Sequence, residues 1–209
     1  MESLKTLSSK YGTNKIWHGY TSFYPRLFEN NRLEYSNFLE IGIDQGASIL
    51  AWRDYFPNCQ IYGIDLKIPS SVVNQDRITV AVADQSKPVL LEDTIKKWNF
   101  PVFDSILDDG GHTVIQQRVS IETLWKYLKK GGFYIIEDLH TNISEFQGVH
   151  PHISKNSGHI DETPTVHDRI ISTMRGSKNQ FKIPFNEIDD IIYYNNPRTM
   201  SLSCAISKI

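Results

Sequence analysis

The sequence predicts an α/β fold built on a doubly wound, mostly parallel β-sheet. Two observations support this prediction. Short apolar runs alternate with helix-like runs between residues 36 and 139, and residues 188–209 form two apolar runs joined by a short Asn-Pro turn. The alternation is typical of a parallel sheet with helices on both faces, and the final pair indicates an antiparallel hairpin. A chain of 209 residues also has the usual size of one such domain.

The first half of the core follows from apolar runs and helical spacing. SNFLEIGI (36–43) is a predicted buried strand, and ASILAWRDYF (47–56) then spaces its apolar residues like a helix. QIYGIDL (60–66) is the second strand, and RITVAVADQS (77–86) contains the third. PVLLEDTIKKW (88–98) opens with proline, which favours the first turn of a helix.

The second half continues the alternation. FDSILDD (103–109) is the fourth strand, and VIQQRVSIETLWKYLKK (114–130) is expected to be one long helix ended by Gly131 and Gly132. FYIIEDL (133–139) is the fifth strand. Helices are also expected at Thr21–Asn31 and Thr163–Gly176.

We expect a single domain with four parts. These are a leader (1–35), the alternating core (36–139), a loop region (140–187) and the closing hairpin (188–209). A net charge of about −2 gives no field that would favour nucleic acid or an anionic membrane. No apolar run reaches transmembrane length, and the first 20 residues lack the apolar stretch of a secretory signal. Cys59 and Cys204 are expected to be buried free thiols, so a cytoplasmic location is predicted.

The junction after the first strand has the features of a ligand-binding turn. EIGIDQG places Glu40, Gly42 and Gly46 at the carboxyl end of a strand, where nucleotide-like ligands approach the backbone. The glycine spacing is GxxxG rather than the dinucleotide pattern GxGxxG, and Asp44 would repel a pyrophosphate. A ligand without phosphates therefore suits this turn better. The alternative is that the glycines only form the turn.

Acidic residues also end the next two strands. Asp65 ends the second strand, 25 positions after Glu40, where a carboxylate can accept both hydroxyls of a ribose. Asp84 ends the third strand, where a side chain could contact an adenine amine. Acids at the ends of three successive strands favour a nucleoside-binding cleft over a set of solvated strand ends.

In their order and spacing these motifs resemble a known family. EIGIDQG, YGIDL, ADQS, FDSILDDGGH and GGFYIIEDLHT look like class I S-adenosylmethionine-dependent methyltransferases. The closer resemblance is to macrocin/mycinamicin-type sugar O-methyltransferases and their bacterial glycan-modifying relatives. It extends from about Tyr11 to Thr141 and includes the leader, where Asn14 replaces the usual Asp. It implies a Rossmann-like sheet of seven strands in the order 3-2-1-4-5-7-6, with the last strand antiparallel.

The resemblance implies S-adenosylmethionine as the cofactor. The residues expected to bind it are Glu40, Gly42, Gly46, Asp65, Asp84, Gln85, Ser86, Asp108 and Lys15. A lysine could pair with the methionine carboxylate of this cofactor, and the leader could cover it with Lys15, His18, Tyr20 and Tyr24. The alternative is that the leader is a solvated arm that packs Trp17 and Phe23 on the core.

Two pairs of carboxylates indicate a metal centre. Asp108 and Asp109 end the fourth strand, and Glu137 and Asp138 end the fifth. Adjacent parallel strands would bring these acids into one crevice, where they repel one another unless neutralised. Hard oxygen ligands favour Mg²⁺, with Mn²⁺ or Ca²⁺ as alternatives. The resemblance assigns the metal to Asp109, Glu137 and Asp138 and leaves Asp108 to the cofactor side.

His112 is the predicted general base. It lies three residues after Asp109, and Gly110 and Gly111 allow a tight turn that aims the imidazole back at the acids. A hydroxyl bound to Mg²⁺ loses part of its proton affinity, and a neutral histidine can then take its proton. The resemblance gives His112 the same role. The alternative is that His112 and Asp109 only form a turn before a helix.

A second metal hypothesis concerns the loop region. The region has no HExxH motif and no cysteine ligand, but four of its histidines could form a zinc site: His150, His152, His159 and His167. A polar substrate loop is the favoured interpretation.

The predicted function is S-adenosylmethionine- and Mg²⁺-dependent O-methylation of a sugar hydroxyl in a glycan or glycosylated metabolite. Three alternatives stay open: a methyltransferase for a catechol-like diol, a nicotinamide-dependent sugar oxidoreductase, and a non-catalytic binding module. The expected partner is the sugar substrate, with no nucleic acid or membrane, and a homo-oligomer is left open.

Overall fold

The chain folds around one seven-stranded sheet in the order β3-β2-β1-β4-β5-β7-β6. The computed structural model describes residues 1–150, 153–154, 157–177 and 181–209. The first five strands are parallel, whereas β7 runs antiparallel to both β5 and β6. This confirms the predicted fold class, strand order and closing hairpin. The strands are β1 (Asn37–Ile41), β2 (Gln60–Asp65), β3 (Ile78–Val82), β4 (Phe103–Asp108), β5 (Leu128–Ile136), β6 (Ile188–Asn196) and β7 (Ser201–Lys208).

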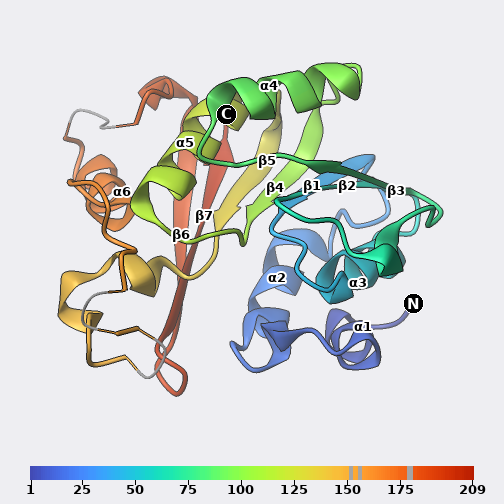
Figure 1. Cartoon of the computed structure of the whole chain (residues 1–209), viewed down its shortest axis with the longest axis horizontal. Coiled ribbons are helices and arrows are strands. Elements are labelled where there is room, and N and C mark those ends of the chain that lie inside the picture. The colour runs from blue at the N-terminus through green and yellow to red at the C-terminus, as the bar shows by residue number, and fades with distance from the viewer. Residues whose placement is uncertain (151–152, 155–156, 178–180) are drawn as a thin grey trace.

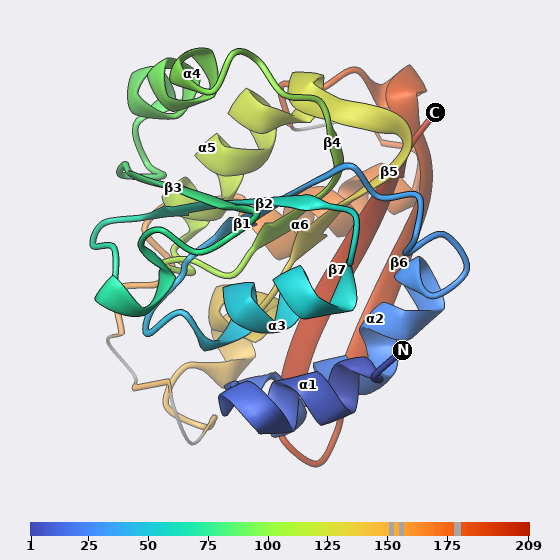
Figure 2. The ribbon, with the colours of Figure 1, turned by 90° about the vertical axis from the view of Figure 1, so that its right-hand side faces the viewer.

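Helices cover both faces of the sheet (Figures 1 and 2). One face carries α1 (Leu4–Tyr11), α2 (Tyr20–Phe28) and α3 (Ala47–Tyr55). The other carries α4 (Pro88–Lys97) and α5 (Val114–Leu124), and α6 (Val166–Met174) packs into the same apolar core as these two. Each face therefore has its own apolar core. Single-turn 3₁₀ helices complete the fold: η1 (Asn14–Ile16), η2 (Ser70–Val72), η3 (Trp125–Tyr127), η4 (Leu139–Asn142), η5 (Ser144–Phe146) and η6 (Phe185–Glu187).

The leader is part of the core rather than a solvated arm. Leu4 and Leu7 of α1 are buried, as are Tyr20, Tyr24 and Phe28 of α2. The α2 helix matches the helix predicted over 21–31, but α1 was not expected, because LKTLSSKY offers only two aliphatic residues to an amphipathic pattern. The residues between α1 and α2 are thereby held at a fixed place on the sheet.

The prediction of one long helix over 114–130 was wrong. The α5 helix ends at Leu124, a 3₁₀ turn follows, and β5 already begins at Leu128, which pairs with Phe103 of β4. Gly131 and Gly132 therefore lie inside the strand and do not end the helix. Gly131 has φ 76°, and a Cβ on Gly132 would lie 2.5 Å from a β4 carbonyl oxygen. Pairing with β4 overrides the helical propensity of YLKK.

Two further findings concern the cysteines and the length of the helices. Cys59 and Cys204 are buried free thiols, as predicted. Among the described residues, no helix is long and apolar enough to cross a membrane.

Candidate active site

A cavity of about 590 Å³ opens at the carboxyl ends of the parallel strands. Parallel strands present their carboxyl ends at the same edge of a sheet, so the residues after β1, β2, β3 and β4 meet there. The leader forms a further wall through Gly12, Thr13 and Asn14. The strand-end segments that line the cavity are 41–45, 64–66, 83–85 and 109–112, joined by Ala47, Ser48, Gln116 and Asp138.

Gly42 and Asp65 shape the floor of this cavity. Gly42 has φ 89°, and a Cβ there would lie 2.0 Å from the carbonyl oxygen of Asp109, so only glycine lets the two loops touch. Asp65 Oδ2 accepts hydrogen bonds from the backbone N–H groups of Ile43 (2.6 Å) and Asp44 (3.1 Å). Asp65 therefore holds the glycine turn and also faces the cavity, where the lone pairs that these bonds leave can accept further hydrogen bonds.

Glu40, Gly46 and Ser86 support the cavity from behind and are not among its lining residues. Glu40 is fully buried and accepts hydrogen bonds from Ser48 Oγ (2.8 Å) and Trp52 Nε1 (3.2 Å). Burial raises the pKa of Glu40 from 4.5 to about 7. Gly46, at φ 89°, packs on the η2 turn.

The segment after β3 also separates into exposed and supporting residues. Asp84 lines the cavity, and its Oδ1 accepts hydrogen bonds from the N–H (2.8 Å) and Oγ (2.7 Å) of Ser86. Ser86 therefore shapes the turn that presents Asp84.

Gln85 connects the β3 end to the loop after β4. Its Oε1 accepts a hydrogen bond from Gly111 N (2.8 Å), and its Nε2 donates to Asp108 Oδ1 (3.0 Å) and Ser120 Oγ (3.1 Å). Asp108 is fully buried beneath the loop, and burial raises its pKa to about 6. Asp108 thus lies behind the cavity rather than on the cofactor side where it was predicted. Gln85 lines the cavity and fixes the loop at the same time.

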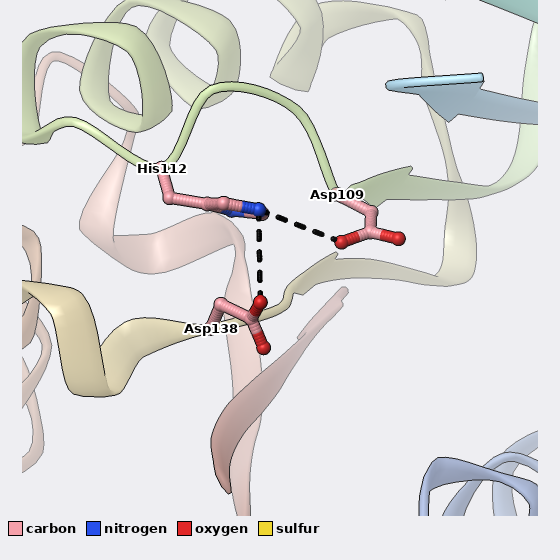
Figure 3. A group of neighbouring side chains, drawn as sticks. All are labelled: Asp109, His112 and Asp138. Atoms are coloured by element: carbon pink, nitrogen blue, oxygen red, sulfur yellow. Dashed lines mark ion pairs between the residues drawn. The ribbon is translucent and has the colours of Figure 1, made fainter. Parts of the chain in front are cut away.

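Asp109, His112 and Asp138 converge at one side of the cavity (Figure 3). His112 Nε2 lies 3.8 Å from Asp109 Oδ1 and 3.6 Å from Asp138 Oδ2. One potential ligand atom from each of the three residues lies within 4.8 Å of the other two. His112 has φ 59°, a left-handed conformation that turns its imidazole back to the acids, and its carbonyl oxygen accepts a hydrogen bond from Thr141 Oγ1 (3.0 Å).

Lys15 places a positive charge directly behind these acids. Its Nζ lies 2.6 Å from Asp109 Oδ2, 2.8 Å from Glu137 Oε1 and 3.6 Å from Glu40 Oε1. Burial alone would lower the pKa of Lys15, but the nearby negative charges outweigh it and hold the pKa well above its usual value. Lys15 is not among the residues that line the cavity, and its partners in the structure are these carboxylates. Its predicted contact with the cofactor carboxylate stays a prediction.

Two tyrosines of α2 hold the pair that follows β5. Tyr20 donates a hydrogen bond to Asp138 Oδ1 (2.8 Å), and Tyr24 donates one to Glu137 Oε1. Asp138 is the N-cap residue of η4 and has φ 54°. Burial, followed by the charge of Asp109, raises the pKa of Glu137. The acidic pair is therefore split: Asp138 faces the cavity, and Glu137 points to the leader.

The zinc hypothesis for the loop histidines gains no support from the part of the chain that is described. There, the group that could hold a metal is Asp109, His112 and Asp138. His150 stacks on His140 with 4.5 Å between ring centroids, and His159 and His167 join no such group. His152 lies outside the described residues.

The donor set fits a hard divalent cation. Three carboxylates, from Glu40, Asp109 and Glu137, contact the Lys15 ammonium group, and the carboxylate of Asp138 lies beside His112, so the cluster has an excess of formal negative charge. Oxygen donors from two carboxylates and the absence of cysteine from the group favour Mg²⁺ over soft metals.

Relatives of known activity share this region of sequence. No family model matches the chain. Mycinamicin VI 2''-O-methyltransferase of Micromonospora griseorubida is 34% identical over 147 residues, which cover 66% of this chain and 36% of that protein. Demethylmacrocin O-methyltransferase of Streptomyces fradiae is 36% identical over 148 residues, with the same two coverages. The chain therefore spans only about a third of the length of the curated relatives it matches.

A solved structure agrees over nearly the whole chain. The MycE methyltransferase from the mycinamycin biosynthetic pathway, in complex with Mg and SAH, superposes with a TM-score of 0.78 and 27% identity. The match covers 99% of this chain and 55% of MycE. The chain is a homologue of the sugar O-methyltransferases. Its fold is that of the class I S-adenosylmethionine-dependent methyltransferases.

The sequence did not predict every residue of the site in this chain, and some predicted residues have other partners in the structure. Gly12 and Thr13 line the cavity together with Asn14, and neither was predicted as a site residue. Tyr20 and Tyr24 were expected to cover a cofactor, but they hydrogen-bond to the acidic pair. The YGTN stretch of the leader was the sequence feature that could have indicated the first two.

Proposed function

We propose that the chain transfers a methyl group from S-adenosylmethionine to a hydroxyl of a sugar, with Mg²⁺ at the site. The observation that supports this most is the convergence of Asp109, His112 and Asp138 beside the strand-end cavity. The relatives named above methylate oxygen atoms, and the MycE structure contains Mg and SAH. A second MycE structure also contains mycinamycin VI, which supports a glycosylated small molecule as the acceptor class.

We assign the cofactor to the cavity and the metal to its acidic side. Gly42, Asp65, Asp84 and Gln85 line the cavity and are the residues proposed to contact the cofactor. Asp65 would accept the ribose hydroxyls through the lone pairs that its backbone hydrogen bonds leave free. Glu40, Gly46, Ser86 and Asp108 would act by holding this wall in place.

The metal would be bound by Asp109 and Asp138. Glu137 would join through its second oxygen, because Lys15 and Tyr24 both bind Oε1. When bound, Mg²⁺ lowers the proton affinity of a hydroxyl, and the cofactor supplies the methyl group. In this proposal Tyr20 orients Asp138 through its 2.8 Å hydrogen bond.

His112 would accept the hydroxyl proton at Nε2. Asp109 and Asp138 lie within 4 Å of this nitrogen, so they would stabilise the imidazolium that forms. The left-handed backbone at His112, fixed by Gln85 through Gly111 and by Thr141, keeps the ring in this orientation.

The buried free thiols support a cytoplasmic location as part of this proposal. The single-domain organisation and the homo-oligomer remain predictions.

The test is transfer of labelled methyl from S-adenosylmethionine to a panel of glycosides and free sugars, with catechol as a competing acceptor. We expect product with a sugar acceptor, loss of product in EDTA and recovery with Mg²⁺. Methylation of catechol and of no sugar would show that the acceptor is a catechol-like diol. Full activity in EDTA would rule out the metal. Tighter binding of NAD⁺ than of S-adenosylhomocysteine would contradict the methyltransferase proposal.

A further inference from the structure

Lys15 is a buried cation that touches the proposed metal centre from behind. Its side chain is 3% exposed, and its Nζ contacts Asp109 Oδ2 at 2.6 Å and Glu137 Oε1 at 2.8 Å. Asp109 and Glu137 are 94 and 122 positions away in the sequence. This ion cluster therefore joins the leader to the ends of two central strands.

The backbone around Lys15 is fixed. Lys15 lies in η1, and its backbone N–H donates a hydrogen bond to Oγ1 of the capping residue Thr13 (3.3 Å). The helices on either side, α1 and α2, are packed in the core through Leu7 and Tyr20. The Lys15 side chain therefore reaches the acids from a backbone that is held in the core.

The contact also divides the two oxygens of Asp109 between two tasks. Oδ2 is bound to Lys15, and Oδ1 lies on the side of His112 Nε2, at 3.8 Å. A free aspartate can rotate and present both oxygens to a cation. Here the ion pair presents one oxygen and places a fixed positive charge next to it.

We propose that Lys15 weakens cation binding at the metal centre, because it occupies Oδ2 of Asp109 and places its own positive charge beside the site. This inference rests on the proposed function. Because a cation would be held less tightly, it would exchange with solvent Mg²⁺ instead of remaining permanently bound. The leader thereby sets the affinity of a site to which it supplies no ligand.

The test compares Lys15→Met with Lys10→Met. Lys10 carries a matched ion pair from α1 to Asp54 at 3.0 Å, but its side chain is 49% exposed and lies outside the cluster. Binding of Mn²⁺ is measured from the electron paramagnetic resonance of the free ion, without any turnover. We expect Lys15→Met to bind Mn²⁺ at least about tenfold more tightly, since a unit charge next to a ligand repels a divalent ion that much even under strong screening. Lys10→Met should match the wild type.

Unchanged or weaker Mn²⁺ binding in folded Lys15→Met would overturn the proposal and leave Lys15 a purely structural residue. If the single variant does not fold, Lys15→Met with Glu40→Gln removes one buried acid together with the lysine. That double variant should still bind Mn²⁺ more tightly than Glu40→Gln alone, and equal binding would overturn the proposal. If the wild type itself binds no Mn²⁺, the proposed function fails together with this inference.

Discussion

Replacing His112 with asparagine separates its proposed chemical role from its role in the turn. His112 has φ 59°, a conformation that costs most L-residues about 1–2 kcal/mol but that asparagine tolerates well. The hydrogen bond from Thr141 ends on the backbone carbonyl of residue 112, so the variant keeps it. We therefore expect His112→Asn to be as stable as the wild type or up to about 1 kcal/mol more stable.

The rate should fall even though the fold is kept. A positioned base contributes about 10²–10⁴-fold, which is roughly 3–5 kcal/mol of barrier. The residual rate of the variant should rise steadily with hydroxide concentration, because no side chain then takes the proton.

The assay is methyl transfer from labelled S-adenosylmethionine between pH 6 and 9, together with thermal unfolding and Mn²⁺ binding. Phe100→Asn is the matched control for the backbone effect. Phe100 also has a positive φ, 54°, but it precedes β4 at the opposite end of the sheet. The Phe100→Asn variant should keep the full rate of methyl transfer. A His112→Asn variant with a near-wild-type rate would refute the base assignment.

Three further predictions follow from the contacts of single carboxylates. Asp65→Asn should weaken S-adenosylhomocysteine binding by about thirtyfold in calorimetry, the worth of one charge-assisted hydrogen bond of about 2 kcal/mol; unchanged affinity would exclude Asp65 from ribose binding. Burial raises the pKa of Glu40 to about 7, so in EDTA the folded protein binds the Glu40 proton more tightly than the unfolded chain does. The protonated carboxyl therefore contributes up to about 3 kcal/mol to the free energy of unfolding, and this contribution should be lost as the pH rises from about 4.5 through 7. Glu40→Gln should flatten this slope of unfolding free energy against pH, and an identical slope would contradict the assignment. Asp138→Asn should abolish turnover while leaving S-adenosylhomocysteine affinity within a few fold; a large loss of cofactor affinity would place Asp138 on the cofactor instead.

Most of the sheet could be predicted because its strands have local patterns. The runs that became β1, β2 and β4 are short, apolar and followed by turn residues, and each lies within the predicted range. The boundary between α5 and β5 could not be predicted, because it depends on pairing between Leu128 and Phe103, 25 positions apart. Helical propensity is local information, whereas this pairing is tertiary.

The site was predictable in its composition but not in its geometry. Acids at strand ends predict a crowded crevice, and Asp109, His112 and Asp138 do meet there. The direction of each side chain depends on distant partners, and no local pattern reports these. The sequence therefore does not indicate that the side chains of Lys15 and Asp108 are both buried, and their predicted contacts with the cofactor stay predictions.

The most direct measurement is an anomalous difference map from crystals grown with Mn²⁺ and S-adenosylhomocysteine. We expect a single anomalous peak between the carboxylates of Asp109 and Asp138, within reach of His112, and cofactor density in the cavity from Gly42 to Asp65. An anomalous peak at the loop histidines, no peak at all, or density for the cofactor outside this cavity would contradict the proposed metal-assisted methyl transfer.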